Sequence, residues 1–343
     1  MKKRVLTLLL ALLMLLAVFP MGFGSAEAAT KTVSPQYIKT ELGNIQYSKN
    51  STTLWKRYAQ GMAIAGSYSY SAVVYSKYTK KASQADSKFA EAQKDAYVQI
   101  IRSKIGGGDA TLTYTYKNKQ NKTVTTKNLW FLGHANDMCA FNYGKYTYLL
   151  VTTNDNKLVL CRVSGTKIDW YRNYYMKCGN DKVRVTGITR LSACGKSTKF
   201  MLANMAQMYK FTLNLDSLPA GGKTIAVTED IKLDIANKNL SLFGTTYKYG
   251  SGNNCWNFQG ITYHSGKLYV PIFAHSKSND VTRSAYLIFN MKGVKTDCVR
   301  ISRALELEAI DFYGSAVYGT IISWYRSGYS TYSGYSSKLL RIA

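Results

Sequence analysis

Short runs of apolar and β-branched residues recur along the chain, and their length and spacing predict strands. Five runs of four residues share this pattern, and a second run of five to seven residues follows most of them. The first set is Ala72–Tyr75, Tyr148–Val151, Lys199–Leu202, Lys267–Val270 and Ala316–Gly319. The second set is Lys157–Val163, Met208–Leu213, Ala285–Phe289 and Lys338–Ile342. The pattern predicts an all-β protein.

A three-residue phrase precedes each pair of runs, and it consists of a polar, a small and an apolar residue. The copies are Gln60-Gly61-Met62, Asn136-Asp137-Met138, Thr186-Gly187-Ile188, Gln259-Gly260-Ile261 and Glu308-Ala309-Ile310. Their central residues are 76, 50, 73 and 49 positions apart. A period of about 50 residues is typical of four-stranded propeller blades. The two long intervals predict insertions, one around Ala82–Lys94 as a short helix and one around Leu215–Gly252.

Five such units predict a five-bladed β-propeller that fills residues 29–343 as one domain. Each phrase would lie on the inner strand of its blade, where a small residue suits the crowded axis. Only three strands fit between the last phrase and Ala343. We therefore expect the fourth strand of that blade to come from Val33–Ile45 and to close the ring. The alternative is a β-sandwich with a second β domain.

The N-terminus has the features of a secretory signal peptide over residues 1–28. Lys2, Lys3 and Arg4 precede an apolar stretch, and Ala26-Glu27-Ala28 offers a cleavage site. The alternative is a membrane anchor, but the apolar stretch is shorter than the roughly 20 residues that a span requires. The sequence therefore predicts a secreted protein without a membrane span.

Six cysteines in a secreted chain permit disulfides. Cys178–Cys194 and Cys255–Cys298 are the pairings we favour, because each would join neighbouring segments, and buried free thiols are the alternative. Cys139 and Cys161 complete the set. No motif for a metal or cofactor is present, and the chain has only three histidines. We expect neither a metal nor a cofactor.

The polar residues of the five phrases would surround one mouth of a central tunnel, where they form a candidate ligand site. The set is Gln60, Asn136, Thr186, Gln259 and Glu308. The alternative is that they satisfy backbone groups at strand ends. His134 and Asp137 form a possible base and orienting partner. Glu308 and Asp311 lie in another copy, so a carboxylate pair across the tunnel, of the kind that glycosidases use, is possible, with Glu308 acting with Asp137 or His134. No complete catalytic motif is present, so the first prediction is that the chain is not an enzyme.

Two segments rich in Tyr, Ser and Gly predict binding loops, because tyrosine offers a rigid ring with a hydroxyl group. Tyr68 and Tyr70 belong to the first segment, and Tyr329, Tyr332 and Tyr335 belong to the second. The alternative is that these tyrosines pack on strands, where aromatic residues are common.

The chain carries 45 basic against 19 acidic residues, a net charge of +26, and removal of residues 1–28 would lower this by two units. The basic residues are mostly lysines and are scattered, which argues against a nucleic-acid partner. A diffuse positive surface favours anionic polymers of a bacterial envelope, such as teichoic acid, anionic lipid or glycan.

Several segments resemble those of the large bacteriocins related to helveticin J and albusin B. They are Gly133–Met138, Trp256–Tyr263, Lys267–Val270 and Leu307–Asp311. The resemblance implies a secreted, heat-labile protein that inhibits related bacteria, and it carries over no catalytic residues. The predicted function is therefore an antibacterial protein that binds the envelope of competing bacteria. The alternatives are a lectin-like binding module without killing activity and a glycan hydrolase acting at the tunnel mouth.

Overall fold

The computed structural model describes residues 29–44, 53–79, 94–105, 107–153, 155–235, 239–250, 254–276, 281–302, 306–327 and 331–343. These residues form strands and one short 3-10 turn, Trp130–Leu132. Within this part of the chain no helix has the length and apolarity to cross a membrane. The predicted signal peptide lies outside the described residues, as does nearly all of the predicted helix at Ala82–Lys94.

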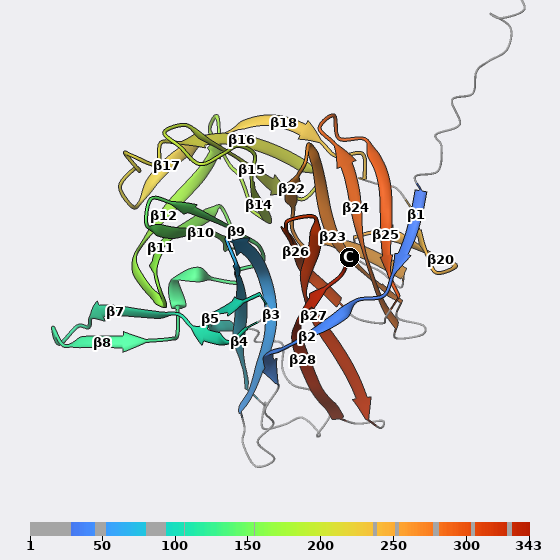
Figure 1. The fold of residues 1–343 in the computed structure, drawn as a ribbon, viewed down its shortest axis with the longest axis horizontal. Helices are drawn as coiled ribbons and strands as arrows, with labels where there is room; N and C mark the ends of the chain where they lie inside the picture. The colour runs from blue at the N-terminus through green and yellow to red at the C-terminus, as the bar shows by residue number, and fades with distance from the viewer. Residues whose placement is uncertain are drawn as a thin grey trace, which may run out of the picture.

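The described residues form five sheets that follow one another along the chain and surround a common centre (Figure 1). We number them in that order.

Sheet 1 contains β3 (Thr53–Ala65), β4 (Tyr68–Thr79), β5 (Lys94–Lys104) and β6 (Asp109–Thr111). Sheet 2 contains β9 (Met138–Tyr143), β10 (Tyr146–Thr152), β11 (Lys157–Ser164) and β12 (Lys167–Cys178), to which β7 (Thr113–Lys117), β8 (Thr123–Thr126), β13 (Asp181–Lys182) and β17 (Lys223–Ala226) are attached. Sheet 3 contains β14 (Gly187–Arg190), β15 (Thr198–Asn204), β16 (Gln207–Leu213) and β18 (Thr228–Lys232).

Sheet 4 contains β19 (Leu240–Leu242), β20 (Thr245–Tyr249), β21 (Asn254–Phe258), β22 (Thr262–His264), β23 (Lys267–Ser276), β24 (Val281–Asn290) and β25 (Lys295–Ile301), with β1 (Ala29–Val33) at its edge. Sheet 5 contains β26 (Glu306–Tyr313), β27 (Ala316–Ser327), β28 (Thr331–Arg341) and β2 (Gln36–Asn44). The second and third strands predicted from the apolar runs all lie in strands of these sheets, except for Ile342, which follows the last residue of β28.

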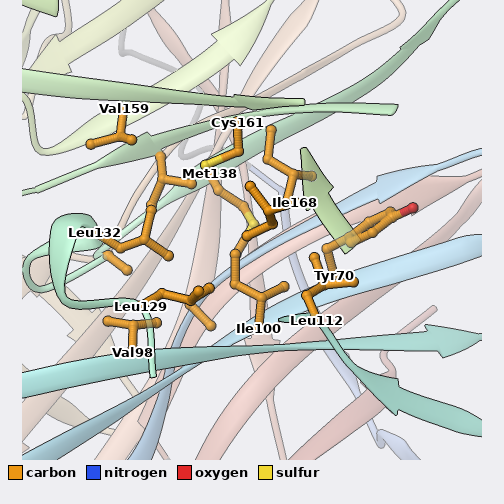
Figure 2. Packing of buried hydrophobic residues seen from close by; sticks show 14 of the residues in the cluster. Tyr70, Val98, Ile100, Leu112, Leu129, Leu132, Met138, Val159, Cys161 and Ile168 are labelled. Carbon is orange, nitrogen blue, oxygen red and sulfur yellow. The ribbon is translucent and has the colours of Figure 1, made fainter. Parts of the chain in front are cut away.

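The hydrophobic core consists mainly of five clusters, each between two sheets. Figure 2 shows the cluster between sheets 1 and 2, in which Tyr70 and Ile100 of one sheet face Met138 and Cys161 of the other. Further clusters lie between sheets 2 and 3, sheets 3 and 4, and sheets 4 and 5. The fifth lies between sheets 5 and 1, where Tyr318 and Leu339 join Met62 and Val73. Packing therefore continues around the whole set of sheets, and the fold is all-β and propeller-like.

An N-terminal strand completes sheet 5, as the sequence predicts. β2 pairs antiparallel with β28, with Gln36 opposite Arg341 and Tyr37 opposite Leu340. The preceding strand, β1, pairs parallel with β25 of sheet 4, which the sequence did not predict. The N-terminal segment therefore joins the edges of two adjacent sheets and covers both.

The predicted disulfides are wrong, because all six cysteines are free. Cys255 lies on β21 and Cys298 on β25, and β23 and β24 lie between these strands. Three strand spacings amount to about 14 Å, well beyond the roughly 7 Å that a disulfide allows between Cα atoms. Cys139, Cys161, Cys255 and Cys298 are buried as free thiols, the alternative drawn from the sequence, and Cys178 and Cys194 are half-buried.

Candidate functional site

The five repeated phrases meet at the centre of the molecule. Gln60-Gly61-Met62 lies within β3 and Glu308-Ala309-Ile310 within β26, while the other three lie at or just before the first residue of β9, β14 and β22. Neighbouring copies are joined by hydrogen bonds: the Gly61 N–H donates to the Ala135 carbonyl at 2.9 Å, and the Thr262 hydroxyl donates to the Ile310 carbonyl at 2.5 Å. Sequence-distant polar groups are therefore brought into one place.

Asp137 fixes the inner edges of sheets 2, 3 and 4. It is only 2% exposed. One carboxylate oxygen accepts the N–H of Ile188 at 2.9 Å and that of Ile261 at 3.0 Å, and the other accepts the N–H of Met138 at 2.9 Å. Burial raises the pKa of Asp137 well above its ordinary value, although these N–H groups oppose the shift. Asp137 therefore stabilises the fold at the axis, whereas the sequence predicted that it orients His134.

Two carboxyl groups lie together beside this point, on alternate residues of β26. Glu306 is half-buried, whereas Glu308 is 2% exposed, and their side chains are hydrogen-bonded. The Gln60 amide donates to Glu308 at 3.2 Å, and the Gln259 amide donates to Glu306 at 3.1 Å. Burial, followed by the Glu306 carboxyl, raises the pKa of Glu308 well above its ordinary value. Two carboxyl groups in contact do not both ionise readily, so the pair holds a proton.

The other predicted mouth residues have different uses. The Thr186 hydroxyl donates to the Ala203 carbonyl and accepts the Met205 N–H, both at 3.0 Å, so it satisfies backbone groups. The amide oxygen of Asn136 is buried and has no hydrogen-bond partner among the described residues. His134 is half-buried, with its ring centre 6.2 Å from that of Tyr58.

One to four residues beyond the central residue of each phrase, all five sheets line a cavity of about 160 Å³. Its walls are Ile64, Met138–Ala140, Ile188–Arg190, Thr262–His264, Asp311 and Phe312. At roughly 30 Å³ per liquid water, it holds about five waters or one small polar group.

Asp311 is the carboxyl group of this cavity. It accepts the N–H of Ile64 at 2.6 Å and that of Phe312 at 2.8 Å. Burial raises its pKa to about 6, although these N–H groups and the nearby Arg190 guanidinium oppose the shift. The His264 ring stacks on Phe312 at 4.0 Å, and burial lowers the pKa of its imidazole. The carboxylate pair was predicted across the tunnel, but Glu308 is hydrogen-bonded to Glu306 of its own strand. Asp137 and Asp311 are instead held by backbone N–H groups.

Sequence reasoning missed Glu306, Arg190 and His264. Glu306 carries a readable signal, because residues two apart on a strand share a face and Glu306 and Glu308 are therefore neighbours. His264 looks like an ordinary turn histidine in the sequence. Arg190 is the third residue after Gly187. This spacing carries no signal by itself, because the cavity is apparent only when the five inner strands are seen side by side.

The predicted tyrosine binding loops do not form as expected. Gly66 and Ser67 make a turn between β3 and β4 of one sheet, and the tyrosines that follow belong to β4. Tyr70 is 2% exposed in the core, and Tyr68 is half-buried, with the Arg102 guanidinium 3.5 Å from its ring centre. Tyr332 and Tyr335 lie in strand β28, and Tyr329 lies outside the described residues. Strand packing explains Tyr70.

No family model and no curated protein matches the chain. Among solved structures, similar arrangements include a GH43 endo-arabinanase from Bacillus licheniformis, with 9% identity, a TM-score of 0.41, and coverage of 83% of this chain and 93% of that one. A glutaminyl cyclase from Myxococcus xanthus has 8% identity and a TM-score of 0.35, with coverage of 92% and 100%. A bifunctional GH43-CE protein from Bacteroides eggerthii has 10% identity and a TM-score of 0.41, over 90% of this chain. This chain spans about a third of that protein, 34%.

The proteins in these comparisons are named as enzymes, which stands against the prediction that this chain is not an enzyme. The identities and TM-scores are low, so the similarities assign neither a reaction nor a catalytic residue to this chain. The reaction has to be inferred from its own site.

Proposed function

We propose that this chain is a glycan hydrolase and that the carboxyl pair Glu306–Glu308 supplies its acid. The observation that carries the proposal is a pair of hydrogen-bonded carboxyl groups on one strand, one half-buried and the other fully buried, which favours retention of a proton between them. Cleavage of a glycosidic bond requires a proton on the departing oxygen, and the donor has to remain protonated near the working pH.

The geometry gives the two residues different roles. Glu306 is the half-buried member and donates its proton to the leaving oxygen. The water that adds to the anomeric carbon releases a proton to solvent, and the pair takes one back from solvent. The Gln60 and Gln259 amides hold both carboxyl groups in place. A pair in hydrogen-bond contact is too close to flank a glycosidic bond, since flanking carboxyl groups are roughly 5 to 9.5 Å apart. The pair therefore acts as one acid on one side of the bond.

Reducing-sugar release from a panel of purified plant and bacterial polysaccharides tests this function. Glu306→Gln and Glu308→Gln should each lower the rate by about 100-fold or more, because either amide removes the shared proton. Glu229→Gln is the matched control, since Glu229 is an exposed glutamate on β18 of sheet 3. In a pH profile, activity should fall as the pH rises through the raised pKa of the pair. Full activity in Glu308→Gln protein, or release from no polysaccharide by the unchanged protein, would refute the proposal.

We further infer that the fold is a five-bladed propeller. Five sheets, five inter-sheet clusters and five central phrases support it. The sequence-based alternative, a sandwich with a second domain, requires a break in this packing. A crystal structure with a break in the ring would overturn the inference.

Secretion and binding to an anionic bacterial envelope remain proposals that rest on the sequence, as does the resemblance to large bacteriocins. The net charge of +26 supports attraction to such a surface. A growth-inhibition assay on related bacteria at low and high salt tests both the antibacterial activity and the role of charge. Normal growth of every strain at low salt would exclude the antibacterial function and leave the hydrolase proposal unaffected.

A further inference from the structure

A two-stranded hairpin, β7–β8, extends away from the ring of sheets (Figure 1). It is attached through its base, where Thr113 and Tyr114 pair with Lys167 and Ile168 at the end of β12. An isolated hairpin of this size is marginal in water. Its order therefore depends on the side chains packed beneath its base.

Those side chains form an aromatic cluster that continues from the core to the surface. Phe131 and Tyr171 stack at 3.7 Å between ring centres, and Tyr114 meets both edge-on. Tyr114 and Tyr116, two residues apart on one face of β7, have nearly parallel rings at 6.0 Å. Trp130 closes the cluster with its edge toward Tyr116 at 4.9 Å.

The outer end of this cluster is open to solvent. Trp130 is 47% exposed and Tyr116 is half-buried, so a rigid aromatic ledge faces outward beside the hairpin. Large apolar surfaces left exposed beside polar groups commonly mark interaction sites. A ring held on both sides loses little conformational freedom when a ligand packs on it.

The chain segment that forms the hairpin and the ledge carries charge of one sign. Residues 110–136 contain four lysines and neither aspartate nor glutamate, although the whole chain has 19 acidic residues. Lys117, Lys119, Lys122 and Lys127 are all exposed. The tip of the hairpin, Asn118–Asn121, is polar, so it offers no apolar wedge to a bilayer.

We propose that the hairpin and its ledge bind an anionic glycan chain, a polysaccharide with carboxylate or phosphate groups. A sugar ring presents a C–H face that packs on Trp130 and Tyr116, while the lysines attract the negative groups along the polymer. This site lies on an appendage of sheet 2, apart from the carboxyl pair on β26. It does not depend on the proposed hydrolysis. Most of the positive charge is scattered over the chain, and this site is where an anionic polymer would bind specifically.

Isothermal titration of the full chain with polygalacturonate tests the site, with the fully methyl-esterified polymer as a neutral probe of the same backbone. Polygalacturonate should bind, and binding should weaken as salt rises. Trp130→Ala should weaken it by about tenfold because the stacking surface is lost. The triple variant K119Q/K122Q/K127Q should weaken it by a similar factor and reduce the dependence on salt. It changes only exposed side chains, so it keeps the test valid if Trp130→Ala fails to fold.

The matched control is K199Q/K223Q/K292Q, which removes the same charge from exposed lysines in other parts of the chain. It should bind within about twofold of the unchanged protein, because screened surface charges act over only about 10 Å. Equal weakening by both triple variants would mean that charge acts diffusely, and it would overturn the site. Equal binding of the neutral polymer, or tighter binding of anionic vesicles or single-stranded DNA that depends on the same residues, would also overturn it. Glu308→Gln protein should bind normally, which separates failure here from failure of the proposed hydrolysis.

Discussion

Gly260 lies against the Asp137 carboxyl group at the axis and leaves no room for a side chain. A Cβ atom added there would lie 2.7 Å from the Asp137 carboxyl carbon and 2.8 and 2.9 Å from its two oxygens. Carbon atoms in contact normally stay about 3.5 Å or more apart. Gly260→Ala therefore forces the carboxylate of Asp137 to move by roughly 0.8 Å, or forces β22 away from sheet 2.

The movement has a calculable consequence, because the carboxylate already holds two backbone N–H groups at 2.9 and 3.0 Å. A shift of that size stretches these contacts beyond the usual hydrogen-bond range. Overpacking costs about 1–3 kcal/mol, and each weakened hydrogen bond adds about 0.5–1.5 kcal/mol. We expect Gly260→Ala to lower the free energy of unfolding by about 3 kcal/mol or more.

Urea unfolding followed by tryptophan fluorescence measures this change. Gly195→Ala is the control, because a Cβ there meets nothing within 4 Å, and it should cost less than about 0.5 kcal/mol. In an Asp137→Ala background the clash is absent, so Gly260→Ala should cost at least about 1 kcal/mol less than in the unchanged protein. Additive costs, or a Gly260→Ala variant as stable as Gly195→Ala, would refute the role given to Asp137.

Three further predictions follow from the fold and the cavity. Because the folded pKa of Asp311 is about 6 against an ordinary 3.8, the folded state keeps a proton that the unfolded state releases between these values. Stability should therefore fall as the pH rises from about 4 to about 6, and Asp311→Asn should make this slope shallower in thermal melts. Asp137 and Glu308, whose pKa values are also raised, still contribute to it, and a slope unchanged by Asp311→Asn would contradict the prediction. Alkylation in urea without reductant should modify all six cysteines, and native protein should react first at Cys178 and Cys194; a mass showing fewer modified thiols in urea would indicate disulfides. Deletion of residues 29–44 should lower the melting temperature and cause aggregation measurable by light scattering, because it exposes the edge of β28; a deletion protein that melts normally would show that β2 contributes little.

The fold was predictable to the extent that it repeats. Apolar runs of strand length identified the second and third strands of the sheets, and the repeated phrases identified the inner ones. The absence of room for a fourth strand before Ala343 led to β2, because a sheet edge needs a partner. Such inferences use only local pattern and chain length, which the sequence contains. β1 escaped prediction, since its pairing with β25 depends on where sheets 4 and 5 meet.

The site was predictable in its residues but not in their roles, because roles depend on what each side chain meets across the axis. Gln60, Gln259 and Glu308 were found from the repeated phrase, yet only the structure places Glu306 between them. Asp137 has the residue type of a catalytic carboxylate, and three backbone N–H groups instead make it the fixed point of the centre. Gly260 lies against that carboxylate. This specific contact explains the small residue at position 260 better than the general crowding of inner strands at the axis. Because Asp137 is committed to the fold at the axis, the proposed function assigns the acid chemistry to the Glu306–Glu308 pair, with the half-buried Glu306 as the proton donor.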